Sequence, residues 1–254
     1  MKEILKELDL NLWKIFEEYK QRYNKLKIGV FVSGGIDSSI VAFWVKKFFP
    51  EACFFSLVKE SSHDWEFLNI LEKFLSIKVT KVDYSASLVK RSFDEVREIY
   101  RKNFFSADLT QLSLGVGFWI LLEKVSPQGI KIIFSGQGPD VLLGGYHRYK
   151  KIKRDQLNKA IIRDLKELEK DKEREKILAD YWRIKIVYPY LEKEIFNLFL
   201  RLPPNLKIKE GKEKYILRKY GEFLNLPVEI VNRPKKAFQY SSGIYKEVKK
   251  LLKS

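Results

Sequence analysis

Cysteine is almost absent from this sequence, which limits the chemistry open to the chain. Cys53 is the single cysteine in 254 residues, so no intrachain disulfide and no cysteine-based zinc cluster can form. It stands in the apolar run Ala52-Cys53-Phe54-Phe55, which is typical of a buried strand. We therefore expect Cys53 to have a packing role rather than a reactive one.

Long apolar stretches are also missing. No run of about 18 uncharged apolar residues is present to span a bilayer, and the first seven residues mix charges where a secretory signal would be continuously apolar. We expect a soluble, cytoplasmic protein without a membrane partner. With 45% hydrophobic residues, the chain can bury the core of one large domain, or of a domain with a closely packed extension.

Acidic residues are too few to balance the basic ones, and the imbalance lies in the C-terminal part. The net charge is +16, and residues 147–254 contain 29 Lys and Arg against 15 Asp and Glu. One interpretation is a surface for RNA or another polyanion. The other is a solvated Lys/Glu-rich surface of a heat-adapted protein. Bases and acids alternate across residues 165–176, as on an exposed helix face, and this favours the second interpretation.

Apolar patterns predict alternating strands and helices in the first 134 residues. Residues 2–25 have apolar side chains with a period close to 3.6, which predicts an amphipathic helix. Short apolar runs predict strands at 27–32, 52–58, 78–83 and 131–134, and helices between them at 37–48, 64–75, 87–103 and 110–125. Each crossover between parallel strands needs a helix, so we predict an α/β fold with a doubly wound parallel sheet. Beyond Tyr149 we predict helices around 156–182, 191–201 and 212–225 and no strand.

A glycine-rich turn follows the first predicted strand. It reads Ser33-Gly34-Gly35-Ile36-Asp37-Ser38-Ser39 and opens the next helix. Paired glycines let successive N–H groups point at one anion, and the N-terminus of the helix adds positive potential. The turn matches neither a Walker A loop nor the dinucleotide fingerprint. It suits the pyrophosphate portion of ATP, although an N-capped turn that binds nothing would use the same residue types.

This turn resembles the signature of the PP-loop superfamily of ATP pyrophosphatases, whose members cleave ATP between the α and β phosphates. Two further segments resemble asparagine synthetases specifically. The segment Ser135-Gly136-Gln137-Gly138-Pro139-Asp140 with Gly144-Gly145-Tyr146 is similar to that family's Ser-Gly-Glu-Gly-x-Asp and Gly-Gly-Tyr. Lys214-Tyr215-Ile216-Leu217-Arg218, Leu226-Pro227 and Arg233-Pro234-Lys235 match its Lys-x-x-Leu-Arg, Leu-Pro and Arg-x-Lys in order and spacing.

The resemblance implies a fold, a division of the chain and a set of site residues. The fold is that of the PP-loop ATP pyrophosphatases, also called adenine nucleotide alpha hydrolase-like, with a helical C-terminal part. We divide the chain into an N-terminal helix (1–25), an ATP pyrophosphatase core (26–150) and a helical C-terminal part that completes the active site (151–254). The implied nucleotide-binding residues are Phe31, Ser33, Gly34, Gly35, Asp37, Ser38, Ser39, Val58, Ser135 and Gly136.

Three of the matching residues have charges that suit catalysis. Asp37 and Asp140 can hold Mg²⁺ against the phosphates of ATP, because hard oxygen ligands and substrate phosphate are its usual environment. A helix cap at Asp37 and a turn-forming role at Asp140 are the alternatives. The resemblance implies that Lys235 neutralises charge on the α-phosphate during transfer. We therefore predict Lys235, Asp37 and Asp140 as catalytic, with ATP and Mg²⁺ as cofactors.

The inferred activity is that of an AMP-forming amide ligase. A carboxylate, aspartate by analogy, would become an acyl-adenylate, and ammonia or an amine would displace AMP. Complete asparagine synthetases also have an N-terminal glutaminase domain with a cysteine nucleophile, and no counterpart precedes the core here. We expect ammonia to be free, supplied by a separate subunit, or replaced by an amine substrate.

Several positions depart from the family and keep other functions open. Gln137 replaces an acid that could accept a proton, and an amide cannot do so. Val141, Lys185 and Val187 replace further charged residues. A catalytically inactive nucleotide-binding regulator is therefore one alternative. Another alternative is a PP-loop enzyme that modifies tRNA, with the basic C-terminal part as its nucleic-acid surface. The Lys-x-x-Leu-Arg, Leu-Pro and Arg-x-Lys series argues against this alternative.

Overall fold

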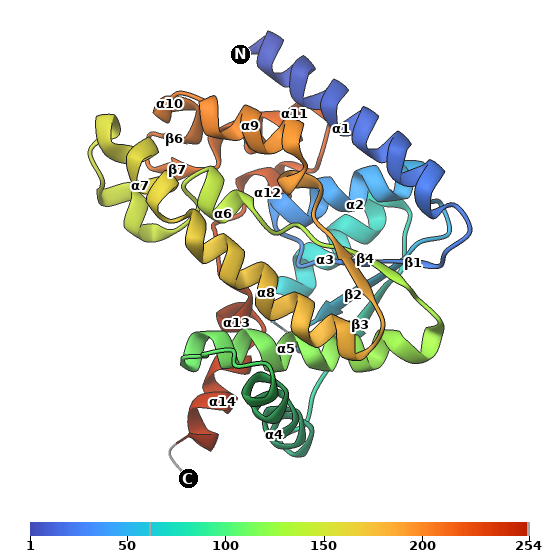
Figure 1. Cartoon of the computed structure of the whole chain (residues 1–254). Helices are drawn as coiled ribbons and strands as arrows, with labels where there is room; N and C mark the ends of the chain where they lie inside the picture. Colours follow the sequence, from blue (N-terminus) through green and yellow to red (C-terminus); the bar gives the residue numbers. More distant parts are fainter. Residues whose placement is uncertain (61, 253–254) are drawn as a thin grey trace.

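A five-stranded parallel sheet lies between two layers of helices in the computed structural model, which describes residues 1–60 and 62–252 (Figure 1). The strand order is β3-β2-β1-β4-β5. The strands are β1 (Ile28–Phe31), β2 (Cys53–Leu57), β3 (Val79–Val82), β4 (Ile132–Phe134) and β5 (Lys185–Val187). The predicted doubly wound parallel sheet is confirmed.

Both faces of the sheet are apolar because successive side chains of a strand point to opposite sides. In β2, Phe54 packs into one layer and Phe55 into the other. The first layer contains α1 (Lys2–Tyr23), α2 (Ile36–Phe48), α3 (His63–Leu75), α9 (Lys193–Arg201), α11 (Tyr215–Phe223) and α12 (Val228–Asn232). The second contains α4 (Ala86–Lys102), α5 (Leu109–Val125), α8 (Leu165–Tyr181) and α14 (Ile244–Leu251).

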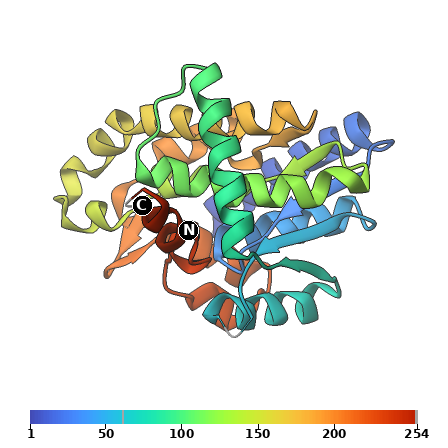
Figure 2. The same ribbon diagram turned by 90° about the horizontal axis from the view of Figure 1, so that it is seen from below.

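Helix α5 is apolar on nearly all sides, and its surroundings explain why. It packs against β2 on one side and against α4, α8 and α14 on the others. Figure 2 shows this layer from below, with α4 crossing α5. Within residues 1–60 and 62–252, no helix is long and apolar enough to cross a membrane.

The amphipathic helix predicted for residues 2–25 is α1. Its buried stripe contains Leu8, Leu12 and Phe16, each at most 1% exposed. These side chains pack toward α2, α9 and α11, so the first helix covers segments that lie far apart in the sequence. Cys53 lies in β2 as expected, and its side chain is partly buried.

The prediction that no strand follows Tyr149 was wrong. β5 joins the sheet beside β4, and a two-residue pair, β6 (Ile208–Lys209) and β7 (Lys212–Glu213), forms a hairpin. Strands this short, with Lys185 exposed, have too few residues for an apolar periodicity. The predicted helix 156–182 is divided into α7 (Leu157–Arg163) and α8. The remaining short helices are η1 (Ser126–Gln128), α6 (Pro139–Leu142), η2 (His147–Lys151), η3 (Arg154–Gln156), η4 (Pro189–Leu191), α10 (Pro204–Lys207) and α13 (Phe238–Ser241).

The winding of the sheet reverses at β1, which pairs with β2 on one side and with β4 on the other. Val30 lies opposite both Phe54 and Phe134. In open parallel sheets, the carboxyl ends of strands at such a reversal border a ligand-binding crevice. The two glycine-rich turns follow β1 and β4, so the fold brings them to the same edge.

Candidate active site

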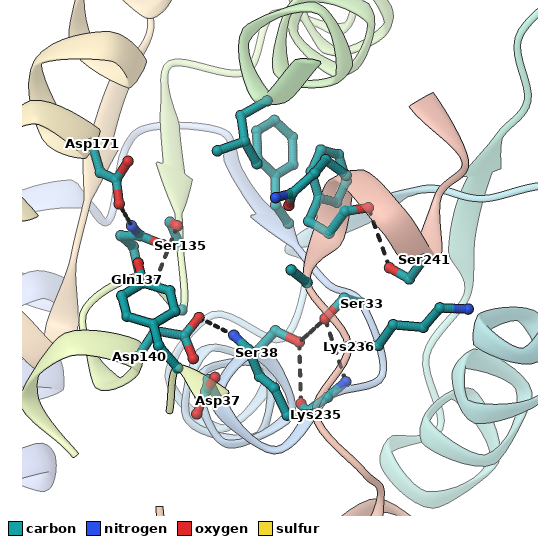
Figure 3. Close-up of a pocket in the computed structure, with 18 of the residues that line it drawn as sticks. Ser33, Asp37, Ser38, Ser135, Gln137, Asp140, Asp171, Lys235, Lys236 and Ser241 are labelled. Carbon is teal, nitrogen blue, oxygen red and sulfur yellow. Dashed lines mark hydrogen bonds and ion pairs between the residues drawn. The ribbon is translucent and has the colours of Figure 1, made fainter. Parts of the chain in front are cut away.

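A cavity of about 430 Å³ lies at the carboxyl ends of β1 and β4 (Figure 3). Its walls come from both glycine-rich turns, from the first turns of α2 and α5, from one face of α8 and from residues 233–241. The predicted site residues that line it are Phe31, Ser33, Gly35, Asp37, Ser38, Ser135, Gly136, Asp140 and Lys235. One cavity therefore joins segments that are separated by up to about 200 positions in the chain.

The phosphate loop, residues 33–39, is held open by its own serines. The Ser38 hydroxyl accepts a hydrogen bond from the Ser33 N–H at 3.1 Å and donates one to the Gly35 carbonyl at 3.2 Å. Gly136 of the second turn packs against the loop so closely that a Cβ would lie 2.9 Å from the Ser38 nitrogen. The two turns thus form one continuous backbone surface at the N-terminus of α2, which suits an anionic ligand.

Three predicted nucleotide-binding residues do not line the cavity. Gly34 has φ +68° and touches Phe67, so it shapes the turn from behind. The Ser39 hydroxyl is buried and has no hydrogen-bond partner in the described part of the chain. The Val58 side chain packs in the core of the first layer, and the preceding Leu57 lines the cavity instead.

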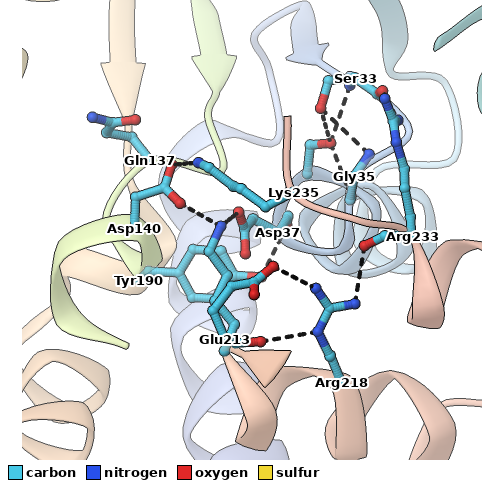
Figure 4. Close-up of polar contacts among 12 residues, drawn as sticks. Ser33, Gly35, Asp37, Gln137, Asp140, Tyr190, Glu213, Arg218, Arg233 and Lys235 are labelled. Carbon is cyan, nitrogen blue, oxygen red and sulfur yellow. Dashed lines mark hydrogen bonds and ion pairs between the residues drawn. The ribbon is translucent and has the colours of Figure 1, made fainter. Parts of the chain in front are cut away.

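Four charged side chains meet beside the phosphate loop (Figure 4). Lys214 Nζ lies 2.6 Å from Asp140 Oδ1 and also forms an ion pair with Asp37. Lys235 forms an ion pair with the other oxygen of Asp140. We call these four residues the phosphate-end cluster. Lys236, the neighbour of Lys235, points away from the two aspartates in Figure 3.

Burial and pairing set the ionisation of this cluster. Burial raises the pKa of Asp37, against the pull of Lys214. Burial also opposes ionisation of Asp140, but Lys214 and Lys235 outweigh it and hold its pKa below the usual range. Burial lowers the pKa of Lys235, although Asp140 counteracts part of this effect. Lys214 is buried too, yet its two carboxylate partners raise its pKa.

The two aspartates fit a magnesium ion that is also held by phosphate. Asp37 Oδ1 is buried and accepts no hydrogen bond from residues 1–60 or 62–252, so a hard oxygen ligand is available in the site. Among the residues that the structure describes, no group of three or more His, Cys, Asp or Glu side chains is placed to hold a metal. The remaining ligands would therefore come from ATP and water, as is usual for Mg²⁺.

Lys214 was not assigned a role from the sequence, where it is only the first residue of Lys-x-x-Leu-Arg. Its backbone is left-handed, with φ +55°, and its side chain is 3% exposed. The signal that could have identified Lys214 was its position as the first residue of a family motif, since a surface lysine of a helix has no such fixed place in a motif.

The arginines of the Lys-x-x-Leu-Arg and Arg-x-Lys motifs connect these segments to the phosphate loop. Arg218 donates to the carbonyls of Val231 at 2.5 Å and Arg233 at 3.1 Å. Arg233 donates to the Ser33 carbonyl at 2.5 Å, forms an ion pair with Asp64 and lies 4.4 Å from the centre of the Phe67 ring. The segment that carries Lys235 is thereby fixed to the loop it faces.

An apolar wall borders the cavity on the side of β2 and α5. The side chains that form it are Phe31, Leu57, Leu114, Phe118, Leu121 and Phe238. The rings of Phe31 and Phe118 meet edge to face, with centroids 5.4 Å apart. A planar apolar group, such as a purine ring, fits such a wall.

The opposite end of the cavity contains charged residues from α8 that were not predicted. Gln137 Nε2 donates to Asp171 at 2.9 Å, and Arg174 forms ion pairs with Asp171 and, at 3.2 Å, with Glu175. Gln111, in the first turn of α5, accepts from Arg174 at 2.7 Å. We call Gln111, Gln137, Asp171, Arg174 and Glu175 the acceptor-end cluster.

This cluster corrects the prediction that residues 165–176 form a wholly exposed helix face. Asp171, Arg174 and Glu175 are between 3% and 7% exposed. They share a face with Leu168 and Leu178, and the spacing of three and four residues was the signal that could have identified a buried stripe. Burial raises the pKa of Glu175, against the pull of Arg174 and of a hydrogen bond from Tyr188.

The other departures from the family pattern lie outside the cavity. Lys185 is exposed on β5, and the side chains of Val141 and Val187 are in the core. Gln137 is therefore the one of these four positions that reaches the cavity.

Comparison with known proteins identifies relatives along the whole chain. The family model of asparagine synthase matches residues 20–186 and 153–254. A protein of Methanocaldococcus jannaschii named putative asparagine synthetase [glutamine-hydrolyzing] 1 is 27% identical, over 96% of this chain and 54% of its own length. Asparagine synthetase B [glutamine-hydrolyzing] of Escherichia coli is 26% identical, over 85% of this chain and 41% of its own length.

A solved structure also resembles the chain, the U34-tRNA thiolase NcsA from Methanococcus maripaludis. Its TM-score is 0.37 with 14% identity, over 94% of this chain and 80% of that one. The chain spans about half the length of the synthetases it matches, between 41% and 54% for the two named above. The family model, in contrast, covers nearly all of it. The chain therefore belongs to the asparagine synthase family.

Proposed function

We propose that this protein is an ATP-dependent amide ligase that forms AMP and pyrophosphate. It would adenylate a carboxylate, aspartate by analogy with the family, for attack by ammonia or an amine. The observation that supports this most strongly is the shared cavity, in which the phosphate-end and acceptor-end clusters lie on either side of the second glycine turn. Such a site can hold ATP and a second substrate together, as an AMP-forming ligase requires.

In the first step, an oxygen of the carboxylate attacks the α-phosphorus, and the bond to the β-phosphate oxygen breaks. The phosphate loop binds the phosphate chain through its backbone N–H groups, and the apolar wall binds the adenine. Lys235 stabilises the charge that develops on the α-phosphate, because its ammonium group is fixed in a largely dehydrated site. Lys214 contributes a second fixed positive charge.

Asp37 and Asp140 would hold Mg²⁺ when ATP binds. The ion supplies charge neutralisation to the phosphate oxygens. Lys214 bridges the two aspartates, which holds their carboxylates close to one another.

In the second step, the amine nitrogen attacks the acyl carbon, AMP leaves, and the nitrogen loses a proton. Gln137 cannot accept that proton. Asp171 is the adjacent carboxylate, and the hydrogen bond from Gln137 orients it. We assign Asp171 as the proton acceptor, with the ion pair to Arg174 holding the carboxylate in place.

The ammonia source is a further part of the proposal. Relatives in the family are named as glutamine-hydrolysing, which supports a separate ammonia-supplying subunit as a partner. Free ammonia or an amine substrate would serve the same cavity.

The test is to incubate the protein with MgATP and a panel of carboxylates, ammonium, simple amines and tRNA, and to measure AMP and pyrophosphate. The proposal expects pyrophosphate release that needs a carboxylate. Release that needs tRNA alone would favour a PP-loop tRNA-modifying enzyme, for which the basic C-terminal part is the supporting observation. ATP binding without any pyrophosphate would favour a nucleotide-binding regulator, for which Gln137 is the supporting departure.

A further inference from the structure

A second hollow of about 600 Å³ lies on the far side of the segment that carries Lys235. We call it the rear hollow. Lys235, Pro234 and Arg218 line both this hollow and the main cavity. Gly145 also lines it, and a Cβ at Gly145 would overlap Asp140 and Lys214. The Gly145 backbone therefore lies between Asp140 and the rear hollow, and Lys235 of the same cluster borders the hollow directly.

The rear hollow is strongly cationic. Its lining contains Lys150, Lys212, Arg218 and Lys235, together with His147, against the single carboxylate of Glu213. Glu213 accepts ion pairs from Lys150 at 2.7 Å and from Arg218 at 3.0 Å. These pairs leave a positive excess at the surface of the hollow.

Lys212 adds to this excess. Lys212 is exposed on β7 and forms no ion pair within residues 1–60 and 62–252. Lys235 pairs with Asp140 on the side of the main cavity. A small anion of high charge that left the phosphate-end cluster past Lys235 would enter a hollow whose lining includes Lys212.

We propose that the rear hollow is a binding site for inorganic pyrophosphate, which it receives as the leaving group departs from the main cavity. This inference rests on the proposed function, because pyrophosphate forms beside Lys235 in that reaction. The acyl-adenylate would still occupy the main cavity between the apolar wall and the acceptor-end cluster. A separate route lets the leaving group depart while the activated intermediate waits for the amine.

Lys212→Ala tests this site, with Lys209→Ala as its matched control. Both lysines are exposed on the same hairpin, but Lys209 does not line the rear hollow. Calorimetric titration of the full chain with pyrophosphate and Mg²⁺ needs no turnover. We expect Lys212→Ala to weaken pyrophosphate binding about three- to tenfold, the loss of one exposed charged contact. It should leave the binding of α,β-methylene-ATP within about twofold, and Lys209→Ala should change neither.

The inference is overturned if Lys212→Ala leaves pyrophosphate binding unchanged, or if it weakens pyrophosphate and the ATP analogue equally. Lys212→Glu should enlarge the difference between the two ligands, since it replaces an attractive charge with a repulsive one. The proposed function fails on a different result, namely the absence of carboxylate-dependent pyrophosphate release. The two failures are therefore distinguishable.

Discussion

The two ends of the cavity are both built from buried charges, but they take them from the chain in different ways. The phosphate-end cluster draws its side chains from four separate segments, each beside a glycine-rich turn or a family motif. The acceptor-end cluster takes Asp171, Arg174 and Glu175 from one face of a single helix. The phosphate-end cluster is tied to the backbone surface that surrounds an anion. The side chains of the acceptor-end cluster, in contrast, can be substituted along one helix without a change in the fold.

The two ends also differ in their balance of charge. At the phosphate end, the charges of two lysines balance those of two aspartates, so the cluster has no net charge before ATP and a divalent ion bind. At the acceptor end, Arg174 is placed between Asp171 and Glu175, which leaves a negative excess. The difference is consistent with phosphate transfer at one end and an amine nucleophile at the other.

The largest effect that separates the two ends is expected for Lys235→Ala. Removal of one fixed charge that stabilises a transition state costs about 10²- to 10³-fold in kcat. Pyrophosphate release should fall by that amount, while binding of an ATP analogue changes only a few-fold. Lys236→Ala is the control, because this lysine is exposed and points away from the aspartates. Equal losses in the two variants would remove the assignment of Lys235.

Asp140→Asn comes next and tests whether the aspartates act as a metal pair. It leaves Lys214 and Lys235 with one carboxylate between them, so we expect a loss of about 3 kcal/mol in unfolding free energy near neutral pH. Because the pKa of Asp140 is lowered in the folded protein, its ionised carboxylate stabilises the fold fully at pH values above the ordinary aspartate pKa. This stabilisation is lost as the pH falls below that value toward the lowered pKa. Mg²⁺-dependent ATP binding, measured by titration, should weaken about 100-fold. Binding that keeps its Mg²⁺ dependence would contradict the role, and Cys53→Ala should leave the Mg²⁺ dependence of ATP binding unchanged.

Asp171→Asn should slow only the second step. Loss of a proton acceptor lowers rates about 10- to 100-fold or more, so amide formation should fall by that factor. Carboxylate-dependent formation of the acyl-adenylate in a single turnover should stay within about threefold. Glu173→Gln, on the exposed side of the same helix, is the matched control. An equal loss in both steps would show that Asp171 maintains the structure of the cavity and does not accept the proton of the amine.

The smallest effect concerns pH. Because burial raises the pKa of Asp37, its carboxyl should stay protonated at pH values where an ordinary aspartate is already ionised. We expect kcat/KM for ATP to fall on the acid side at a pH above the ordinary pKa of an aspartate. The fall should persist in Asp171→Asn, since that residue lies at the other end. An inflection at or below the ordinary value would contradict the burial of Asp37.

The same comparison explains how much the sequence could predict. Asp37 and Asp140 were found because glycine turns encode backbone geometry over a few residues, and the alternating strands encode the sheet that aligns the turns. Asp171 and Arg174 were missed because burial of a charge depends on partners such as Gln111 and Gln137, which lie at least 34 positions away. β5 was missed for a related reason, since three residues become a strand only by pairing with β4.

One predicted nucleotide-binding position shows how fine the spacing is. Val58 was predicted at the end of β2, and the side chain that lines the cavity there is that of its neighbour Leu57. Successive side chains of an extended chain point to opposite faces, so a shift of one position moves a residue from the cavity into the core.

The central claim is that this cavity activates a carboxylate by adenylation, and simultaneous measurement of both products tests it most directly. The protein is incubated with MgATP and each carboxylate in turn, and AMP, pyrophosphate, ADP and phosphate are separated and quantified. The account predicts AMP and pyrophosphate in equal amounts, dependent on one class of carboxylate and lost in Lys235→Ala. Formation of ADP and phosphate, or equal AMP release without any carboxylate, would contradict it.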